Sequence, residues 1–224
     1  MSKTVVLTFD DACRSHLEFV APLLRGYGFG ATFFVCRPEN WLAKDPEAFL
    51  SGPEIGELSR AGFEIGNHTL NHICLEEADE EQGRGDIAGL NALLSDNGVP
   101  APVSFAYPGG PYAEKAAQWL GDFGFRCART TEKGLWSRGT DPMRVPSWSI
   151  CFSGEARREE AIAALEASED EDSAAVLLYH GVPDEVHPWV STPPEMFVRH
   201  MDRLREKNFR VVGMGAWSAE LLAR

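Results

Sequence analysis

The sequence predicts an α/β fold: a distorted (β/α) barrel of about seven or eight parallel strands, formed by residues 1–224 as a single domain. Two observations predict it. Short apolar segments alternate with amphipathic ones along the chain, which is the pattern of a parallel sheet covered by helices. No linker, low-complexity tract or fixed-period repeat interrupts the alternation, so one domain accounts for the whole length.

The elements follow one another in a regular order. Short runs rich in β-branched and aromatic residues indicate strands, and apolar residues at helical spacing, often followed by glycine, indicate helices. Strands are expected at residues 4–9, 31–35, 63–66, 103–107, 125–129, 144–150, 174–179 and 209–214. Helices are expected at residues 16–26, 53–61, 76–97, 113–123, 155–169, 195–207 and 217–223.

Charge and cysteine content limit the possible partners. Lys and Arg number 21 against 34 Asp and Glu, a net charge of -13, which repels nucleic acid and anionic membranes and also favours solubility. The five cysteines are odd in number and contain no C-x-x-C pair, so neither a disulfide framework nor a thiolate zinc site is expected. With no apolar leader at its start, a sequence that is complete there predicts a cytoplasmic protein.

Polar residues follow several expected strands directly. Asp10 and Asp11 end the first, His68 follows the third, residues 108–110 form a Pro-Gly-Gly turn after the fourth, and His180 ends the strand at 174–179. In a parallel barrel the carboxyl ends of the strands meet at one rim. We therefore expect these residues to lie around one mouth.

Asp11, His68 and His72 form a candidate metal site. His68 and His72 have the i, i+4 spacing that puts two imidazoles on one face of a helical turn, but the catalytic Glu of H-E-x-x-H proteases is absent. Taken alone, Asp10 and Asp11 are better explained as a polar loop start or helix cap, and His68 and His72 are equally consistent with two unrelated histidines. Together, two histidines and one carboxylate leave coordination positions open for water and substrate.

Proton-transfer and oxyanion groups can also be assigned. Asp10 could deprotonate a water activated by the metal. The N–H of Gly109, in the turn that follows Tyr107, could receive a developing oxyanion, although the turn alone is equally an ordinary one. His180 could protonate a leaving nitrogen, whereas a lone histidine there is more often structural.

The ordered segments TFDD, NHTLNH, FAYPGG and LLYHG resemble those of the polysaccharide deacetylases of carbohydrate esterase family four. The resemblance implies a barrel of this kind and removal of an N-acetyl or other N-acyl group from an amino sugar. It also implies Asp10 as general base, His180 as general acid, and Asp11, His68 and His72 as ligands of one divalent metal, usually zinc.

One departure concerns the third segment. Many members of the family have an arginine where Ala106 stands, and that arginine orients the base. We expect Arg144, which opens the strand at 144–150, to replace it and Trp148 to line the acyl pocket; a surface ion pair and core packing are the alternative roles. In the same way, the loop with His187, Pro188 and Trp189 could cover the mouth and stack on a sugar, or be an ordinary surface loop.

Two other functions remain open from the sequence. The same metal site could hydrolyse a C–N bond of a small formamide, cyclic imide or ureide, which the altered third segment favours. A catalytically silent metal-binding or sugar-binding protein is the third possibility, against which the complete set of ligands and proton-transfer groups argues.

Overall fold

The structure, a computed structural model, describes residues 3–151 and 154–223. Its sheet has eight strands within these residues, in the order β5-β4-β3-β2-β1-β7-β6 with β8 beside the first half of β1, and every strand pair is parallel. The strands are β1 (Thr4–Phe9), β2 (Thr32–Val35), β3 (Glu64–Asn67), β4 (Ser104–Ala106), β5 (Cys127–Arg129), β6 (Trp148–Ser149), β7 (Ala174–Tyr179) and β8 (Arg210–Val212). The predicted distorted barrel is confirmed.

The two edges of this sheet are joined by the chain between β5 and β6. Val145 forms a parallel bridge with Arg129 at the end of β5, and a few residues later Trp148 pairs with Leu177 of β7. Continuous pairing through β5 and β6 is short because the connecting segment contains Pro142 and Pro146, which lack the N–H that a ladder requires. The expected strand at 144–150 is therefore mostly wrong: a 3₁₀ turn (Pro142–Arg144) precedes it and only β6 is strand.

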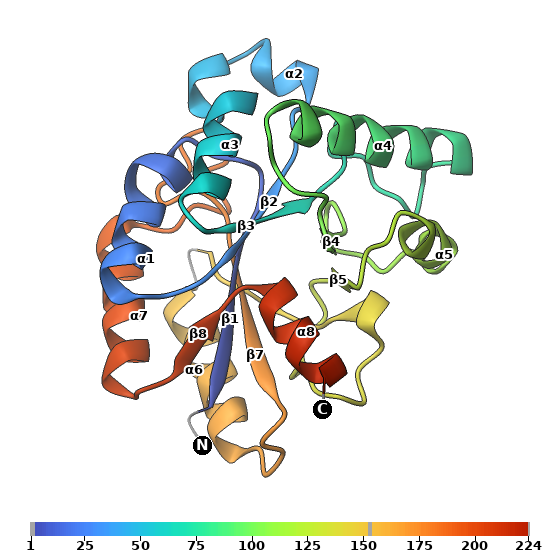
Figure 1. Ribbon diagram of the computed structural model, residues 1–224. Coiled ribbons are helices and arrows are strands. Elements are labelled where there is room, and N and C mark those ends of the chain that lie inside the picture. Colours follow the sequence, from blue (N-terminus) through green and yellow to red (C-terminus); the bar gives the residue numbers. More distant parts are fainter. Residues whose placement is uncertain (1–2, 152–153, 224) are drawn as a thin grey trace.

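Most of the helices pack against the outer face of the curled sheet. Figure 1 shows α1, α3 and α7 on one side of the central strands and α4 and α5 on the other. The helices are α1 (Ala21–Tyr27), α2 (Glu39–Leu42), α3 (Gly52–Arg60), α4 (Glu80–Asp96), α5 (Glu114–Asp122), α6 (Gly154–Ala167), α7 (Pro194–Glu206) and α8 (Met214–Ala223). A π-helical turn (His16–Val20) precedes α1, and a 3₁₀ turn (Pro46–Ala48) follows α2; neither α2 nor this turn was expected.

Alternation along the strands divides the core into layers. Leu7 and Phe9 of β1 pack with the layer that includes Leu24 of α1. Val6 faces the other way, against Trp217 of α8. All five side chains are at most 1% exposed, so β1 is packed on both faces and its carboxyl end is fixed in place. Among the described residues, no helix is long and apolar enough to span a membrane.

Candidate metal and catalytic site

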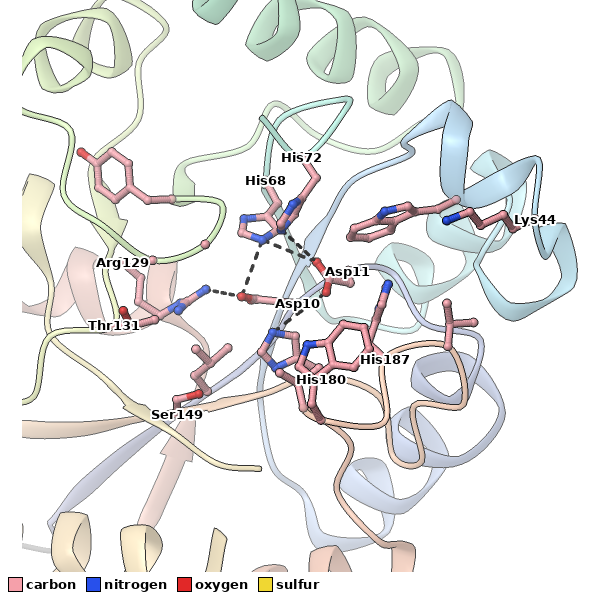
Figure 2. Close-up of a pocket in the computed structure, with 18 residues that line it drawn as sticks. Asp10, Asp11, Lys44, His68, His72, Arg129, Thr131, Ser149, His180 and His187 are labelled. Carbon is pink, nitrogen blue, oxygen red and sulfur yellow. Dashed lines mark hydrogen bonds and ion pairs between the residues drawn. The ribbon is translucent and has the colours of Figure 1, made fainter. Parts of the chain in front are cut away.

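Five polar side chains from four strand ends surround one cavity of about 630 Å³. Asp10 and Asp11 follow β1, His68 follows β3, Arg129 is the last residue of β5, and His180 follows β7. Figure 2 shows these side chains pointing toward one another, with His72 beside His68. The expectation that the strand ends bring residues 10, 11, 68, 72 and 180 to one mouth agrees with this geometry.

Asp10 and Asp11 both face His68. Their carboxylate oxygens lie 3.7 Å and 3.6 Å from His68 Nε2, whereas neighbours in an extended chain would point to opposite sides. The reason is the backbone of Asp11, whose φ of 76° is in the left-handed region. Such conformations cost free energy in a residue other than glycine and are concentrated at functional sites.

The segment from His68 to His72 is an irregular loop, so the expected helical turn is wrong. Thr69 and His72 have φ values of 58° and 54°, and a left-handed β-branched residue such as Thr69 persists only when its surroundings hold it. Here Asn67 Oδ1 accepts the N–H of Thr69 at 2.8 Å, and Asp86 of α4 accepts the N–H of Asn71 at 2.8 Å. This loop aims both imidazoles at Asp11.

The three predicted ligands have a geometry that fits a divalent metal. His68 Nε2 and His72 Nε2 each lie 3.6 Å from Asp11 Oδ1, and one donor atom of each residue lies within 4.8 Å of the others. Tetrahedral ligands at about 2.1 Å from zinc are about 3.4 Å apart. The residues thus fit the ion that the sequence predicts, and it is the single His/Cys/Asp/Glu group of this kind in the described part of the chain.

The protonation states also suit metal binding. Burial lowers the pKa of His68 to about 4 and that of His72 to about 3, so both imidazoles are neutral at pH 7. His68 Nδ1 donates a hydrogen bond to the carbonyl oxygen of Ala106 at 2.8 Å, which leaves the Nε2 lone pair free. Burial, Asp10 and Asp184 raise the pKa of Asp11 well above its usual range, as expected for a carboxylate that needs a cation beside it.

Arg129 is the partner of Asp10. Its Nη2 donates a hydrogen bond to Asp10 Oδ2 over 2.5 Å, and both side chains are buried. Burial alone would raise the pKa of Asp10, but Arg129, His68 and His180 together bring it below the usual value. Asp10 is therefore ionised at neutral pH and able to accept a proton.

The hypothesis that Arg144 orients Asp10 is wrong. Its guanidinium donates two hydrogen bonds of 2.8 Å to Glu132 and lies over the ring of Tyr112, and the side chain is half exposed. The reason is the 3₁₀ turn that contains it, which projects the side chain outward. Arg129 is a charged residue that ends a buried apolar strand, the same pattern that identified Asp10 and His180, and it was assigned no function from the sequence.

Trp148 was expected to line the cavity, and this expectation is wrong. It is 3% exposed and packs in the layer under the helices, which is the alternative role that the sequence allowed. The next residue of β6, Ser149, lines the cavity instead, because neighbours in a strand point to opposite faces.

His180 closes the opposite side of the site from His72. Its Nε2 lies 4.0 Å from Asp11 Oδ2, and burial lowers the pKa of the imidazole. Behind it, the carbonyl oxygen of His180 accepts a hydrogen bond of 3.1 Å from Nε2 of the buried His16. His16, which was assigned no function from the sequence, thus holds the chain that carries His180.

The turn after β4 forms another part of the wall. Tyr107, Gly109 and Gly110 line the cavity, and the two glycines have φ values of 72° and 97°, which favour glycine. The hydroxyl of Tyr107 is donated to the carbonyl oxygen of Met143 at 3.0 Å. Contact of Tyr107 with substrate and donation from the Gly109 N–H remain predictions.

Comparison with known proteins agrees with this architecture. The family model described as polysaccharide deacetylase matches residues 1–128, more than half of the chain. A peptidoglycan-N-acetylglucosamine deacetylase of Bacillus cereus is 29% identical over 143 residues, which are 62% of this chain and 59% of that protein. The chain spans about half of the length of the curated relatives it matches, from 42% to 59%.

Solved structures share the fold at low identity. The peptidoglycan N-acetylglucosamine deacetylase Bc1960 superposes with a TM-score of 0.67 at 20% identity, over 96% of this chain and 87% of that one. BA3943 of Bacillus anthracis, a pseudoenzyme of carbohydrate esterase family four, superposes with a TM-score of 0.66 at 16% identity. The superposition covers 97% of this chain and 66% of that one. With the family model matching from β1 through β5, the chain belongs to the polysaccharide deacetylase family.

Proposed function

We propose that this protein is a metal-dependent hydrolase that removes the N-acetyl group, or another N-acyl group, from an amino sugar. The observation that carries the proposal is the convergence of Asp11, His68 and His72 within 4.8 Å of one another, with ionised Asp10 and His180 on either side. The family fold alone would not suffice, because a pseudoenzyme shares it.

The three ligands would hold a divalent ion, which we expect to be zinc. When bound, it supplies Lewis acidity: the acyl carbonyl is polarised and the pKa of water falls. Asp10, held by Arg129, accepts the proton of the attacking water as a general base. We assign stabilisation of the negative charge that develops on the acyl oxygen to the Gly109 N–H.

The leaving group departs on the opposite side. A C–O bond forms between the water oxygen and the acyl carbon while the water proton passes to Asp10. That proton then moves to the His180 imidazole, whose Nε2 gives it to the nitrogen as the C–N bond breaks. The products are a free amine and a carboxylic acid, which loses its proton to the solvent as a carboxylate, and Asp10 and His180 end in their starting states. No oxidant or further reactant is required.

The family and the activity named for the Bacillus cereus relative support an acetylated amino sugar as substrate. A small formamide, cyclic imide or ureide is the second candidate. This candidate is supported by the departure from the family at Ala106. The arginine that contacts Asp10 is here Arg129, which comes from another strand. The same residues would serve either substrate, since the bond broken is C–N in both.

Release of carboxylate from a panel of substrates tests the proposal. Zinc-loaded protein is given acetylated amino sugars, short acetylated oligosaccharides and soluble small amides, before and after chelation. We expect metal-dependent acetate release from the sugars. Metal analysis of Asp11→Asn and His72→Ala accompanies it, with His200→Gln as the control histidine. Retained zinc stoichiometry in both ligand variants would contradict the site, and turnover of small amides alone would favour the second candidate.

A further inference from the structure

Two tryptophans flank His187 at the rim of the cavity. The ring centroid of His187 lies 4.6 Å from that of Trp41 and 5.4 Å from that of Trp189, and all three residues line the cavity that holds the predicted metal ligands. The ring centroid of Trp41 also lies 5.0 Å from that of His72. Trp41, His187 and Trp189 therefore form an aromatic wall that begins at the predicted metal site and extends outward. Trp189 is 66% exposed, which is unusual for this residue type.

The loop that carries His187 and Trp189 is held by a buried carboxylate. Asp184, 4% exposed, accepts the backbone N–H groups of Val186 and His187 at 3.1 Å and 2.7 Å and also lies 3.5 Å from His187 Nδ1. Its own N–H is donated to Ser191 at 2.9 Å. The exposed aromatic surface is therefore ordered before any ligand arrives, which reduces the entropic cost of binding.

A lysine without a partner stands beside the wall. Lys44, two residues after α2, lines the cavity, and Figure 2 shows its side chain directed toward the site. The other four lysines of the chain are bound to Ser168, Ala78, Glu160 and Glu166. Within residues 3–151 and 154–223, Lys44 is thus the one lysine with no hydrogen-bond or ion-pair partner for its ammonium group.

We propose that Trp41, Lys44, His187 and Trp189 form a rim subsite for a sugar ring that carries an anionic substituent, a carboxylate or a phosphate. The inference rests on the proposed function, because the N-acyl group of the same substrate would lie at the predicted metal. The indole rings offer flat apolar surfaces to the C–H face of a pyranose. The ammonium group supplies local positive charge in a chain whose net charge of -13 would otherwise repel an anion.

The charge and the stacking make separate contributions to binding. An exposed ion pair adds a modest free energy that salt weakens, so Lys44 should select the anionic sugar without being required for binding. The tryptophan surface is indifferent to that charge. Loss of Trp189 should accordingly lower the binding affinity for neutral and anionic sugars by the same factor.

Calorimetric titration separates these contributions. All arms use zinc-loaded protein carrying Asp10→Asn, so that the ligand is not consumed, and three probes: N-acetylglucosamine, N-acetylmuramic acid and N-acetylglucosamine 6-phosphate. We expect at least one anionic probe to bind about three- to tenfold more tightly than N-acetylglucosamine at low salt, and the difference to shrink at high salt. The preferred anion identifies carboxylate or phosphate as the substituent.

Matched variants assign the effect to the rim. Lys44→Met should abolish the preference and Lys207→Met, which removes a lysine paired with Glu166, should retain it. Trp189→Ala should weaken all three probes, whereas Leu222→Ala, the other exposed large apolar residue, should not. Equal affinity for all probes, or a preference that survives Lys44→Met, would overturn the subsite. If the preference depends on Lys44 but active protein releases no acetate from any sugar, the subsite stands and the proposed deacetylation fails.

Discussion

The Arg129 guanidinium donates a hydrogen bond of 2.5 Å to the Asp10 carboxylate, although the two residues are 119 positions apart in sequence. Asp10 follows β1 and Arg129 ends β5, with three strands between them in the sheet. The contact, together with His68 and His180, holds Asp10 ionised, and burial would otherwise favour its protonated form. Asp10 can therefore act as a base although its side chain is buried. We propose from this contact that Arg129 positions Asp10 in place of the arginine missing at Ala106.

Replacing Arg129 should change the pH dependence of turnover as well as its rate. Without the guanidinium, the pKa of Asp10 rises, and because the base must be ionised, the acidic limb of the pH–rate profile moves to higher pH. We expect Arg129→Gln to lower kcat about 10- to 100-fold and Arg129→Lys to lower it less. Arg144→Ala, which removes an exposed pair with Glu132, is the control and should leave the profile unchanged. An unshifted limb in Arg129→Gln would argue against the positioning role.

Loss of His180 should depend on the leaving group. An amine needs a proton as it departs, whereas p-nitrophenolate leaves without one. We expect His180→Ala to lower turnover of an N-acetyl amino sugar by about 100-fold or more and hydrolysis of p-nitrophenyl acetate much less. Steady-state rates on both substrates measure the difference. Equal losses on the two would indicate that His180 does not act as the acid.

A side chain at Gly110 should disturb the turn that carries Gly109. A Cβ atom there would lie 2.2 Å from Thr131 Oγ1, and the φ of 97° disfavours other residues. We expect Gly110→Ala to cost about 1–3 kcal/mol of unfolding free energy and to lower kcat. Gly121→Ala in α5, where nothing lies within 4 Å, should instead stabilise by about 0.5–1 kcal/mol. Chemical denaturation measures the unfolding free energies of both variants. An unchanged stability in Gly110→Ala would show that a side chain at this position causes no strain.

Acid should destabilise the protein partly through His200. This buried histidine lies 3.0 Å from the Tyr179 hydroxyl, and burial lowers its pKa from 6.5 to about 3. Below pH 6.5 the unfolded chain binds a proton that the folded one does not, so stability present above pH 6.5 is lost as pH falls toward about 3.

The variant His200→Phe isolates this contribution. It should have a shallower dependence of unfolding free energy on pH over that window, by up to about 1.4 kcal/mol per pH unit, whatever its stability at neutral pH. Denaturant midpoints measured from pH 7 to 4 give the two slopes. The same slope in both proteins would show that another group is responsible.

Most of the fold followed from local patterns. Apolar runs such as Thr4–Phe9 and Ala174–Tyr179 are strands at the predicted bounds, because a strand buried on both faces needs such a run. The strand expected at 144–150 is mostly wrong because prolines near it remove ladder donors and tertiary bridges decide where pairing resumes.

The site was predictable to the extent that it lies on strand ends. Asp10, His68 and His180 follow from that rule, and Arg129 would have followed had it been applied to β5. The shape of the loop from His68 to His72 did not follow, because its left-handed residues are held by Asn67 and by Asp86 of α4, contacts far apart in sequence. Lys44 and Trp41 lie on an unexpected short helix and its end, where periodicity carries no signal.

Turnover by Asp10→Asn with its metal content measured in the same sample tests the central claim most directly. Asparagine keeps the size of the side chain but cannot accept the proton of water. We expect the zinc-loaded variant to bind as much metal as the wild type, through Asp11, His68 and His72, and to release almost no acetate from an N-acetyl amino sugar that the wild type hydrolyses. Full acetate release by the metal-loaded variant would contradict the claim.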